Sequence, residues 1–197
     1  SRRWSPGGNV LSTDQVPQAS EPGMLELSRV FYRRVKEGDD YHLKPLESGD
    51  TVKIAKGDYS LGYAIEVGLT KNLTFEGGYD TVDNFSTKSL GVRSTYMTRL
   101  IAPAGNYVFN FTTAANTSTV RNFLLQGNGS SVVYSSAANP TIEGNVVVPK
   151  GGDYGISLSA SAGATVRNNI VMETGLGIFL GTGSTATNNT VVNGSSY

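Results

Sequence analysis

The 197-residue sequence contains no cysteine, a single histidine and few charged residues. Without cysteine the chain has no disulfide framework and no thiolate metal site, while its redox compartment stays undetermined. A metal site at His42 would need a second His or a Cys, and the sequence has neither. The charged residues are 16% of the chain and cancel to a formal net charge of zero, so no nucleic-acid partner is predicted.

Long apolar runs are also missing. None approaches the roughly 18 residues that a membrane-spanning helix requires, so no membrane span is predicted. The chain starts at Ser1 without methionine, which indicates a processed product. What the sequence has in abundance is glycine, 24 residues, with Ser, Thr and Asn dominating the second half. This composition favours a surface that is polar without being charged.

The length predicts one main folded domain. We expect residues 1–47 to form an extended arm with a capping segment, and residues 48–197 to form the domain. Residues 1–23 mix Pro, Gly and polar residues without a period, which is typical of an arm. Either its own domain or a neighbouring subunit is expected to hold this arm in place.

Residues 24–37 allow two interpretations. Met24, Leu27 and Phe31 recur at helical spacing, which favours a helix. Apolar residues in the same stretch also alternate, so a strand remains open. Either element would serve as a cap on the domain that follows.

From residue 48 the chain consists of short apolar alternations separated by Gly, Asn, Asp and Ser, a pattern that predicts strands and tight turns. One segment type, an Asn followed by apolar residues, recurs every 20 to 24 residues. We align its copies on four residues: Asn122, Asn145, Asn169 and Asn189. A fixed period of this length indicates a solenoid, in which the chain returns to the same place in every coil.

Recurring segments stack most naturally as parallel strands in register. An Asn in one coil can then bond the Asn above and below it, which satisfies a polar group that would otherwise be buried alone. Leucine-rich repeats are disfavoured because no helix-forming stretch lies between the strands. The sequence therefore predicts an all-β fold, a right-handed parallel β-helix solenoid of about six to seven coils.

Several segments also resemble a known family. "SGDTVKIAKGDYSLG" (48–62) and "KNLTFEGGYD" (71–80) resemble the first coils of extracellular right-handed parallel β-helix proteins, the pectate-lyase-like superfamily with carbohydrate-binding and sugar-hydrolysing repeats. "TVRNFLLQGN", "PTIEGNVVV" and "ATVRNNIVM" resemble its internal repeats. The resemblance spans about residues 48–194. It implies the fold, but the scaffold carries lyases, hydrolases, epimerases, adhesins, tailspikes and structural proteins alike.

The resemblance also implies what an enzyme of this superfamily would need. Its lyases use an Asp cluster that holds calcium together with an Arg or Lys base, and its hydrolases use three Asp residues near Gly-His-Gly and Arg-x-Lys motifs. Between residues 84 and 197 the acidic residues are Glu143, Asp153 and Glu173. Glu143 and Glu173 stand at different distances from their repeat Asn, so they do not form an evident pair. The sequence therefore predicts a protein that is not an enzyme.

No cofactor is predicted, apart from a weak candidate calcium site. Glu76, Asp80 and Asp83 offer three carboxylates within eight residues, although a solvated turn with capped backbone amides is the favoured interpretation. Arg121 and Arg167 occupy similar places in their repeats without an acidic cluster. They are expected to be stacked surface residues.

Seven Asn-x-Ser/Thr sequons are candidate glycosylation sites, as expected for an exported protein: Asn72, Asn84, Asn110, Asn116, Asn128, Asn188 and Asn193. In a chain rich in Ser and Thr, several such sequons arise by chance.

Five tyrosines are candidates for stacking against sugars: Tyr79, Tyr96, Tyr107, Tyr134 and Tyr154. Tyrosines in strands more often belong to the core or to the edge of a coil.

The end of the repeat suggests how the protein works. No polar helix, proline or charged run follows Asn189, and an uncovered solenoid end recruits another chain. Head-to-tail contacts that do not close produce filaments. The sequence therefore predicts a non-enzymatic extracellular or cell-surface structural protein, a filament-forming subunit that binds neighbouring copies through its arm and open β-helix end. The alternatives are a polysaccharide-binding or polysaccharide-cleaving β-helix protein, and a fragment of a larger adhesin.

Overall fold

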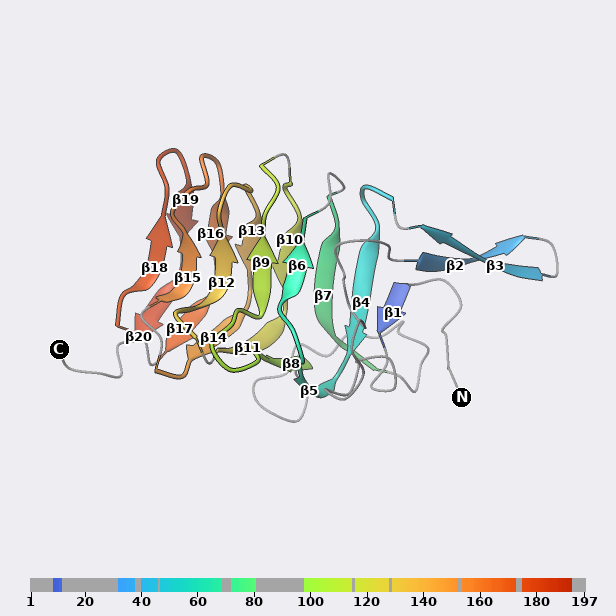
Figure 1. The fold of residues 1–197 in the computed structure, drawn as a ribbon, viewed down its shortest axis with the longest axis horizontal. Helices are drawn as coiled ribbons and strands as arrows, with labels where there is room; N and C mark the ends of the chain where they lie inside the picture. The colour runs from blue at the N-terminus through green and yellow to red at the C-terminus, as the bar shows by residue number, and fades with distance from the viewer. Residues whose placement is uncertain are drawn as a thin grey trace.

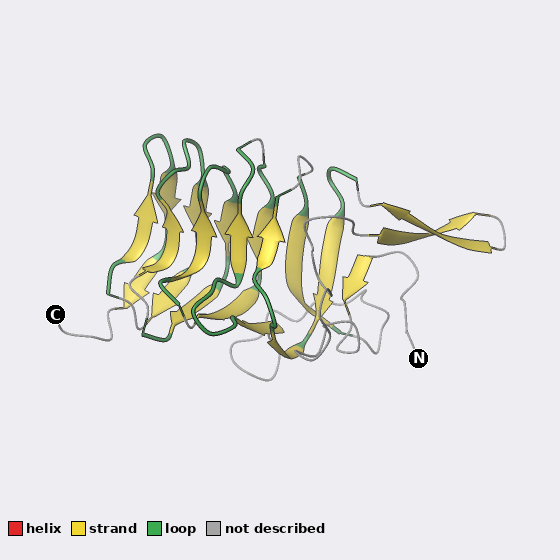
Figure 2. Cartoon of the chain, in the orientation of Figure 1, coloured by secondary structure: helices red, strands yellow, loops and turns green. Residues whose placement is uncertain are grey.

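The computed structural model describes the backbone of residues 9–11, 32–37, 40–45, 47–68, 72–80, 98–114, 116–127, 129–151, 154–172 and 175–192, with side chains from residue 47 onward. Within these ranges the chain forms strands and turns and no helix (Figure 2). Accordingly, no described helix has the length and apolar character needed to cross a membrane.

Three parallel sheets make up the main body (Figure 1). The first has the order β1 (Asn9–Leu11), β4 (Thr51–Ala55), β7 (Thr74–Tyr79), β10 (Thr119–Arg121), β13 (Thr141–Glu143), β16 (Thr165–Arg167) and β19 (Thr185–Thr187). The second has the order β5 (Gly57–Ser60), β8 (Thr98–Ile101), β11 (Phe123–Gly127), β14 (Val146–Pro149), β17 (Ile170–Met172) and β20 (Thr190–Val192). The third has the order β6 (Ile65–Val67), β9 (Phe109–Phe111), β12 (Ser131–Ser135), β15 (Tyr154–Leu158) and β18 (Gly177–Leu180).

Each coil passes through the three sheets in turn, so the fold is a right-handed parallel β-helix, as predicted. The described strands complete five coils, β4–β6 to β16–β18, and β19 and β20 begin a sixth. The predicted six to seven coils are slightly too many because the repeat is not uniform. Most coils return after 20 to 24 residues, but the coil that separates Asn72 from Thr117 takes 45.

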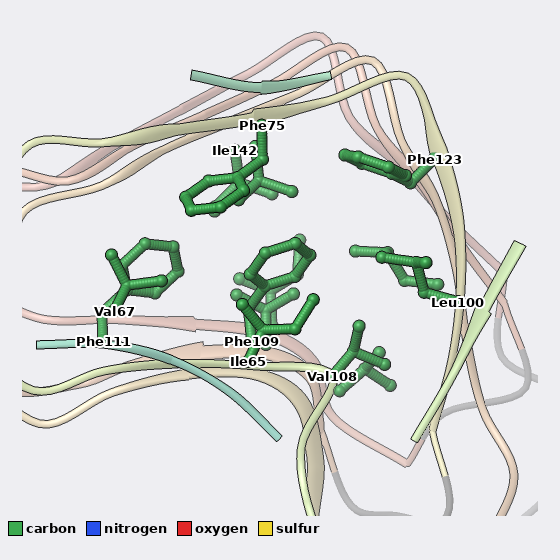
Figure 3. Packing of buried hydrophobic residues seen from close by; sticks show 14 of the residues in the cluster. Ile65, Val67, Phe75, Leu100, Val108, Phe109, Phe111, Phe123 and Ile142 are labelled. Atoms are coloured by element: carbon green, nitrogen blue, oxygen red, sulfur yellow. The ribbon is translucent and has the colours of Figure 1, made fainter. Parts of the chain in front are cut away.

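The interior is filled by stacked apolar side chains. Inward residues of the first sheet lie in register, for example Phe75, Val120 and Ile142. Around Phe109, ring centroids lie 5.5 Å from Phe75 and 6.0 Å from Phe123, which makes an aromatic centre in the second and third coils (Figure 3). Burying a side chain of this size stabilises the fold by about 1.5–3 kcal/mol. The stacking of like on like therefore supplies one continuous core.

A second interior row is polar. The side-chain oxygens of Asn169 and Asn189 each accept hydrogen bonds from the backbone and side-chain nitrogens of the Asn one coil below, at 3.0–3.1 Å. Each side-chain amide also donates to a backbone carbonyl of the coil below, as Asn145 does to Val120 at 3.0 Å. Asn145 and Asn169 are buried, so these bonds satisfy groups that water does not reach. This asparagine ladder ties successive coils together at one corner.

The structure excludes Asn122 from this ladder. Asn145 accepts from the backbone N–H of Phe123 at 3.1 Å, so Phe123 holds the ladder position in its coil. Asn122 is one residue earlier, with φ of 63°, matching Gly144 at 62° and Asn168 at 57°. That left-handed conformation suits Gly and Asn. Aligning the repeats on any Asn therefore shifts this coil by one residue.

The N-terminal region differs from the helix favoured by the sequence. β2 (Tyr32–Glu37) and β3 (Asp40–Pro45) form an antiparallel hairpin beyond the first coil, so that expectation is wrong for residues 32–37 (Figure 1). The two-residue connection Gly38-Asp39 is a hairpin signal that outweighs the helical spacing. Residues 24–31 lie outside the described residues. In the arm, β1 pairs with β4 of its own chain.

Replacing Asn145 with alanine tests the ladder. Asn145→Ala removes the partners of the Phe123 N–H and the Val120 carbonyl in a buried place, and we expect the free energy of unfolding to fall by about 3 kcal/mol. Asn72→Ala is the control, because Asn72 accepts one bond at an exposed turn and its loss should cost less than about 1 kcal/mol. Urea unfolding measures both, and equal losses would contradict a special role for the ladder.

Candidate functional site

Charged side chains gather on the outer face of the first sheet. Because successive strand residues point to opposite faces, the residues on either side of the inward Phe75 or Val120 point outward. One outward position is Thr in six successive coils. The other holds five charged residues in register, which we call the charged row: Lys53, Glu76, Arg121, Glu143 and Arg167. Their charges alternate in sign along the β-helix.

Glu76 is the buried member of the row, with only 3% of its surface exposed. One carboxylate oxygen lies 2.7 Å from Nε of Arg121 and accepts a hydrogen bond from Nδ2 of Asn122 at 3.0 Å. The other accepts from the Tyr79 hydroxyl at 2.5 Å. Both oxygens are therefore held by protein groups, and Asn122 has its function here.

Glu143 bridges two arginines from the neighbouring coils. Its oxygens lie 3.4 Å from a terminal nitrogen of Arg121 and 2.6 Å from one of Arg167. Nε of Arg167 also donates to Glu143 at 2.8 Å. Each carboxylate in this part of the row thus has a cation in an adjacent coil. The expectation that no acidic residues accompany Arg121 and Arg167 is wrong.

The electrostatics of the cluster hold its protons in place. Burial, and then the hydrogen bond with Glu76, raise the pKa of Tyr79 well above its ordinary value. Burial alone would lower the pKa of Arg121, but the charge and hydrogen bond of Glu76 outweigh it, so that pKa is raised. Tyr79 therefore stays protonated and Arg121 stays charged. Neither group can exchange a proton near neutral pH, as a general acid or base must.

The candidate calcium residues do not come together. Glu76 is held by Tyr79, Arg121 and Asn122 as described above, whereas the carboxylate of Asp80 lies 3.0 Å from Nζ of Lys56. Asp83 falls outside the described residues. In the part of the chain with described side chains, no three His, Cys, Asp or Glu residues are grouped to hold a metal ion.

Other candidate residues remain untested. Asp153 and Glu173 lie outside the described residues, and of His42 the structure describes the backbone in β3 alone. The predicted absence of a Glu143–Glu173 pair therefore stays a prediction.

The sequons occupy different environments. Asn116 is buried, and its side-chain oxygen accepts from the backbone of Ser118, so glycosylation at Asn116 is contradicted. Asn110 donates its amide to both oxygens of Glu66 at 2.8 and 3.0 Å. Asn188 is exposed and Asn72 is half-buried. Asn84, Asn128 and Asn193 lie outside the described residues.

The tyrosines separate into core and surface groups. Tyr79 is buried beside Glu76, and Tyr96 lies outside the described residues. Tyr107, Tyr134 and Tyr154 are half-buried on the third sheet or at its edge, where their rings stack with neighbours. These three residues form a second candidate surface, separate from the charged row.

Sequence reasoning missed the charged row, although part of its signal was present. Glu143 and Arg167 each precede a ladder Asn by two residues, and Arg121 precedes Phe123 by two. Alignment on the repeat Thr, rather than on Asn, brings these three residues together. Glu76 could not be added in this way, because 45 residues separate its coil from the next.

Comparison with known proteins gives one match. The model of a protein family described as "Periplasmic copper-binding protein (NosD)" matches residues 46–196, most of the chain. Neither a curated protein nor a solved structure matches. The predicted location outside the cytoplasm is confirmed at that coarse level, whereas a place at the cell surface stays a prediction.

The same match corrects the prediction that the protein has no cofactor, because the family is described as copper-binding. Copper prefers Cys, Met and His ligands. The matched range contains no Cys and no His, and its two Met residues are Met97, outside the described residues, and Met172 on β17. The donor set among the described residues does not fit a copper centre of the usual kind, so we assign none of them to copper.

Replacing Glu76 with glutamine tests the charged row. Glu76→Gln leaves Arg121 without its nearest anion in a buried place, and we expect a loss of about 3 kcal/mol in the free energy of unfolding. Glu143→Gln is the matched control, since its arginines are more exposed and about 1 kcal/mol is expected. Urea titrations at neutral pH compare the variants, and a larger loss from Glu143→Gln would contradict this ranking.

Proposed function

Because this chain belongs to the NosD family of periplasmic copper-binding proteins, we propose that it is an exported scaffold protein that does not itself cleave polysaccharides. It acts through the outer faces of a rigid β-helix. The observation that carries the proposal is the charged row, where carboxylates gather most densely among the described residues. There each carboxylate is engaged by an arginine of a neighbouring coil.

The chemistry of sugar cleavage explains why this observation matters. Glycosidases need two carboxyl groups, one of which keeps a proton to deliver to the leaving group. A carboxylate beside an arginine is instead held in its charged form. A lyase needs a free base, and the guanidinium of Arg121 is bound to Glu76 and Glu143. The charged row therefore supports a role in holding coils together rather than in catalysis.

Association between copies is the second part of the proposal. In the described residues, β19 and β20 each pair with a strand on one side only. Val191 is in register with the buried Val171 but is 45% exposed. An open edge with exposed apolar residues favours addition of another strand. Since β1 already pairs with β4 of its own chain, the proposed contact uses the last coil rather than residues 9–11.

Activity measurements test the first part. We expect no increase in reducing ends or unsaturated uronate when the protein is incubated with polygalacturonate or neutral polysaccharides, with or without calcium. Arg121→Ala and Glu143→Gln serve as controls, because genuine turnover at the charged row would change in both. Turnover by the natural protein that both variants abolish would contradict the proposal.

Light scattering with negative-stain electron microscopy tests the second part. We expect the protein to form species larger than a monomer, and we expect Val191→Lys to remain monomeric because it places a charge on the open coil. Leu176→Lys, a change at an exposed turn, is the control and should associate like the natural protein. Monomers at every concentration of the natural protein would refute association through this edge.

A further inference from the structure

One aromatic side chain from each of the five complete coils lies along the third sheet. We call these residues the aromatic strip: Tyr63, Tyr107, Tyr134, Tyr154 and Phe179. Tyr63 and Tyr107 occupy the same place in successive coils, because they precede Ile65 and Phe109 by two residues and those two are in register. The strip therefore follows the axis of the β-helix, with a step of about 4.8 Å per coil.

Ring stacking orders the middle of the strip. The rings of Tyr107 and Tyr134 are nearly parallel, at 12°, with centroids 4.7 Å apart. Those of Tyr154 and Phe179 lie 5.5 Å apart at 25°. Each pair joins two adjacent coils. Rings held in this way lose little conformational freedom on binding a ligand, which favours affinity.

The strip is accessible, most of all at its two ends. Tyr63 is 59% exposed and Phe179 is 48% exposed, and Leu176 beside the last coil is exposed too. Between the rings of Tyr134 and Phe179 stands Ser157, in register with both. Small residues between large rings leave hydroxyl and aromatic groups alternating along one line. Such a line offers both apolar contact and hydrogen bonds.

The charge of this face restricts its ligand. Among the described strands of the third sheet, Glu66 is the only charged residue, and its carboxylate accepts two hydrogen bonds from the amide of Asn110. No described cation in these strands would balance a negative ligand. The first sheet, by contrast, carries the five charged side chains of the charged row. The aromatic strip therefore complements an uncharged molecule.

We propose that the aromatic strip binds a neutral linear polysaccharide lying parallel to the β-helix axis. The repeat of rings along about 19 Å matches a ligand that itself repeats rings and hydroxyl groups, which a globular protein partner does not. The tyrosine hydroxyls bond to the sugar hydroxyls, and the ring surfaces contact the apolar faces of the sugars. An acidic polymer is disfavoured because Glu66 is the charge it would meet. The inference goes beyond the scaffold function and holds whether or not copies associate.

Affinity electrophoresis of the full chain tests this inference. The native gels contain mixed-linkage β-glucan, galactomannan, hydroxyethylcellulose, dextran or polygalacturonate. We expect at least one neutral polymer to retard the protein and polygalacturonate to leave it unretarded. Phe179→Ala and Tyr134→Ala should weaken binding about tenfold each, the size of one well-packed aromatic contact.

Ile170→Ala provides the matched control. Ile170 lies in the same coil as Phe179 and is similarly exposed, at 43%, but it belongs to the second sheet. Its loss should leave binding unchanged. Because Phe179 is already exposed, its variant should fold even if Tyr134→Ala does not, and circular dichroism checks this.

Four results would overturn the inference. They are the absence of retardation by every neutral polymer, retardation by polygalacturonate alone, equal loss of binding in Ile170→Ala, and strip variants that change the mass in solution instead of polymer binding. The last result would assign this face to a protein contact.

Discussion

The register between coils is the constraint on which the rest of this structure depends. Parallel strands place each residue directly above its counterpart in the coil below, so every position of the repeat becomes a row along the β-helix. A position that is apolar in each coil makes a core. A polar position makes a row of like groups about 4.8 Å apart, and that row must satisfy itself.

The chain meets this requirement differently inside and outside. Inside, asparagine serves because its side chain both donates and accepts, so one residue type repeated in each coil forms a connected ladder. Outside, a row of identical charges would repel by about 1 kcal/mol per contact even in water. The first sheet instead alternates acid and base, so Arg121 and Glu143 each lie between opposite charges. The residues that looked like separate surface charges are thus one electrostatic unit.

The three faces consequently have different characters. The first sheet is charged but internally neutralised, the third is aromatic and nearly uncharged, and the last coil is open on one side. The NosD family brings a description as copper-binding, yet the matched part of this chain lacks the imidazole and thiolate groups that copper prefers. A scaffold that uses its faces for recognition agrees with the chemistry that the described residues present.

The sequence by itself determined the fold class, the strands from residue 51 onward and three of the four ladder positions. These follow from spacing along the chain, and each coil of 20 to 24 residues repeats that spacing. The one-residue shift at Asn122 was decided by backbone conformation, because a left-handed residue and a ladder residue can both be Asn. The contact of Glu76 with Arg121, the stacking of Tyr107 on Tyr134 and the pairing of β1 with β4 required the tertiary structure. Each joins different coils, or the arm and a coil, and the length of chain between them is not constrained by any local pattern.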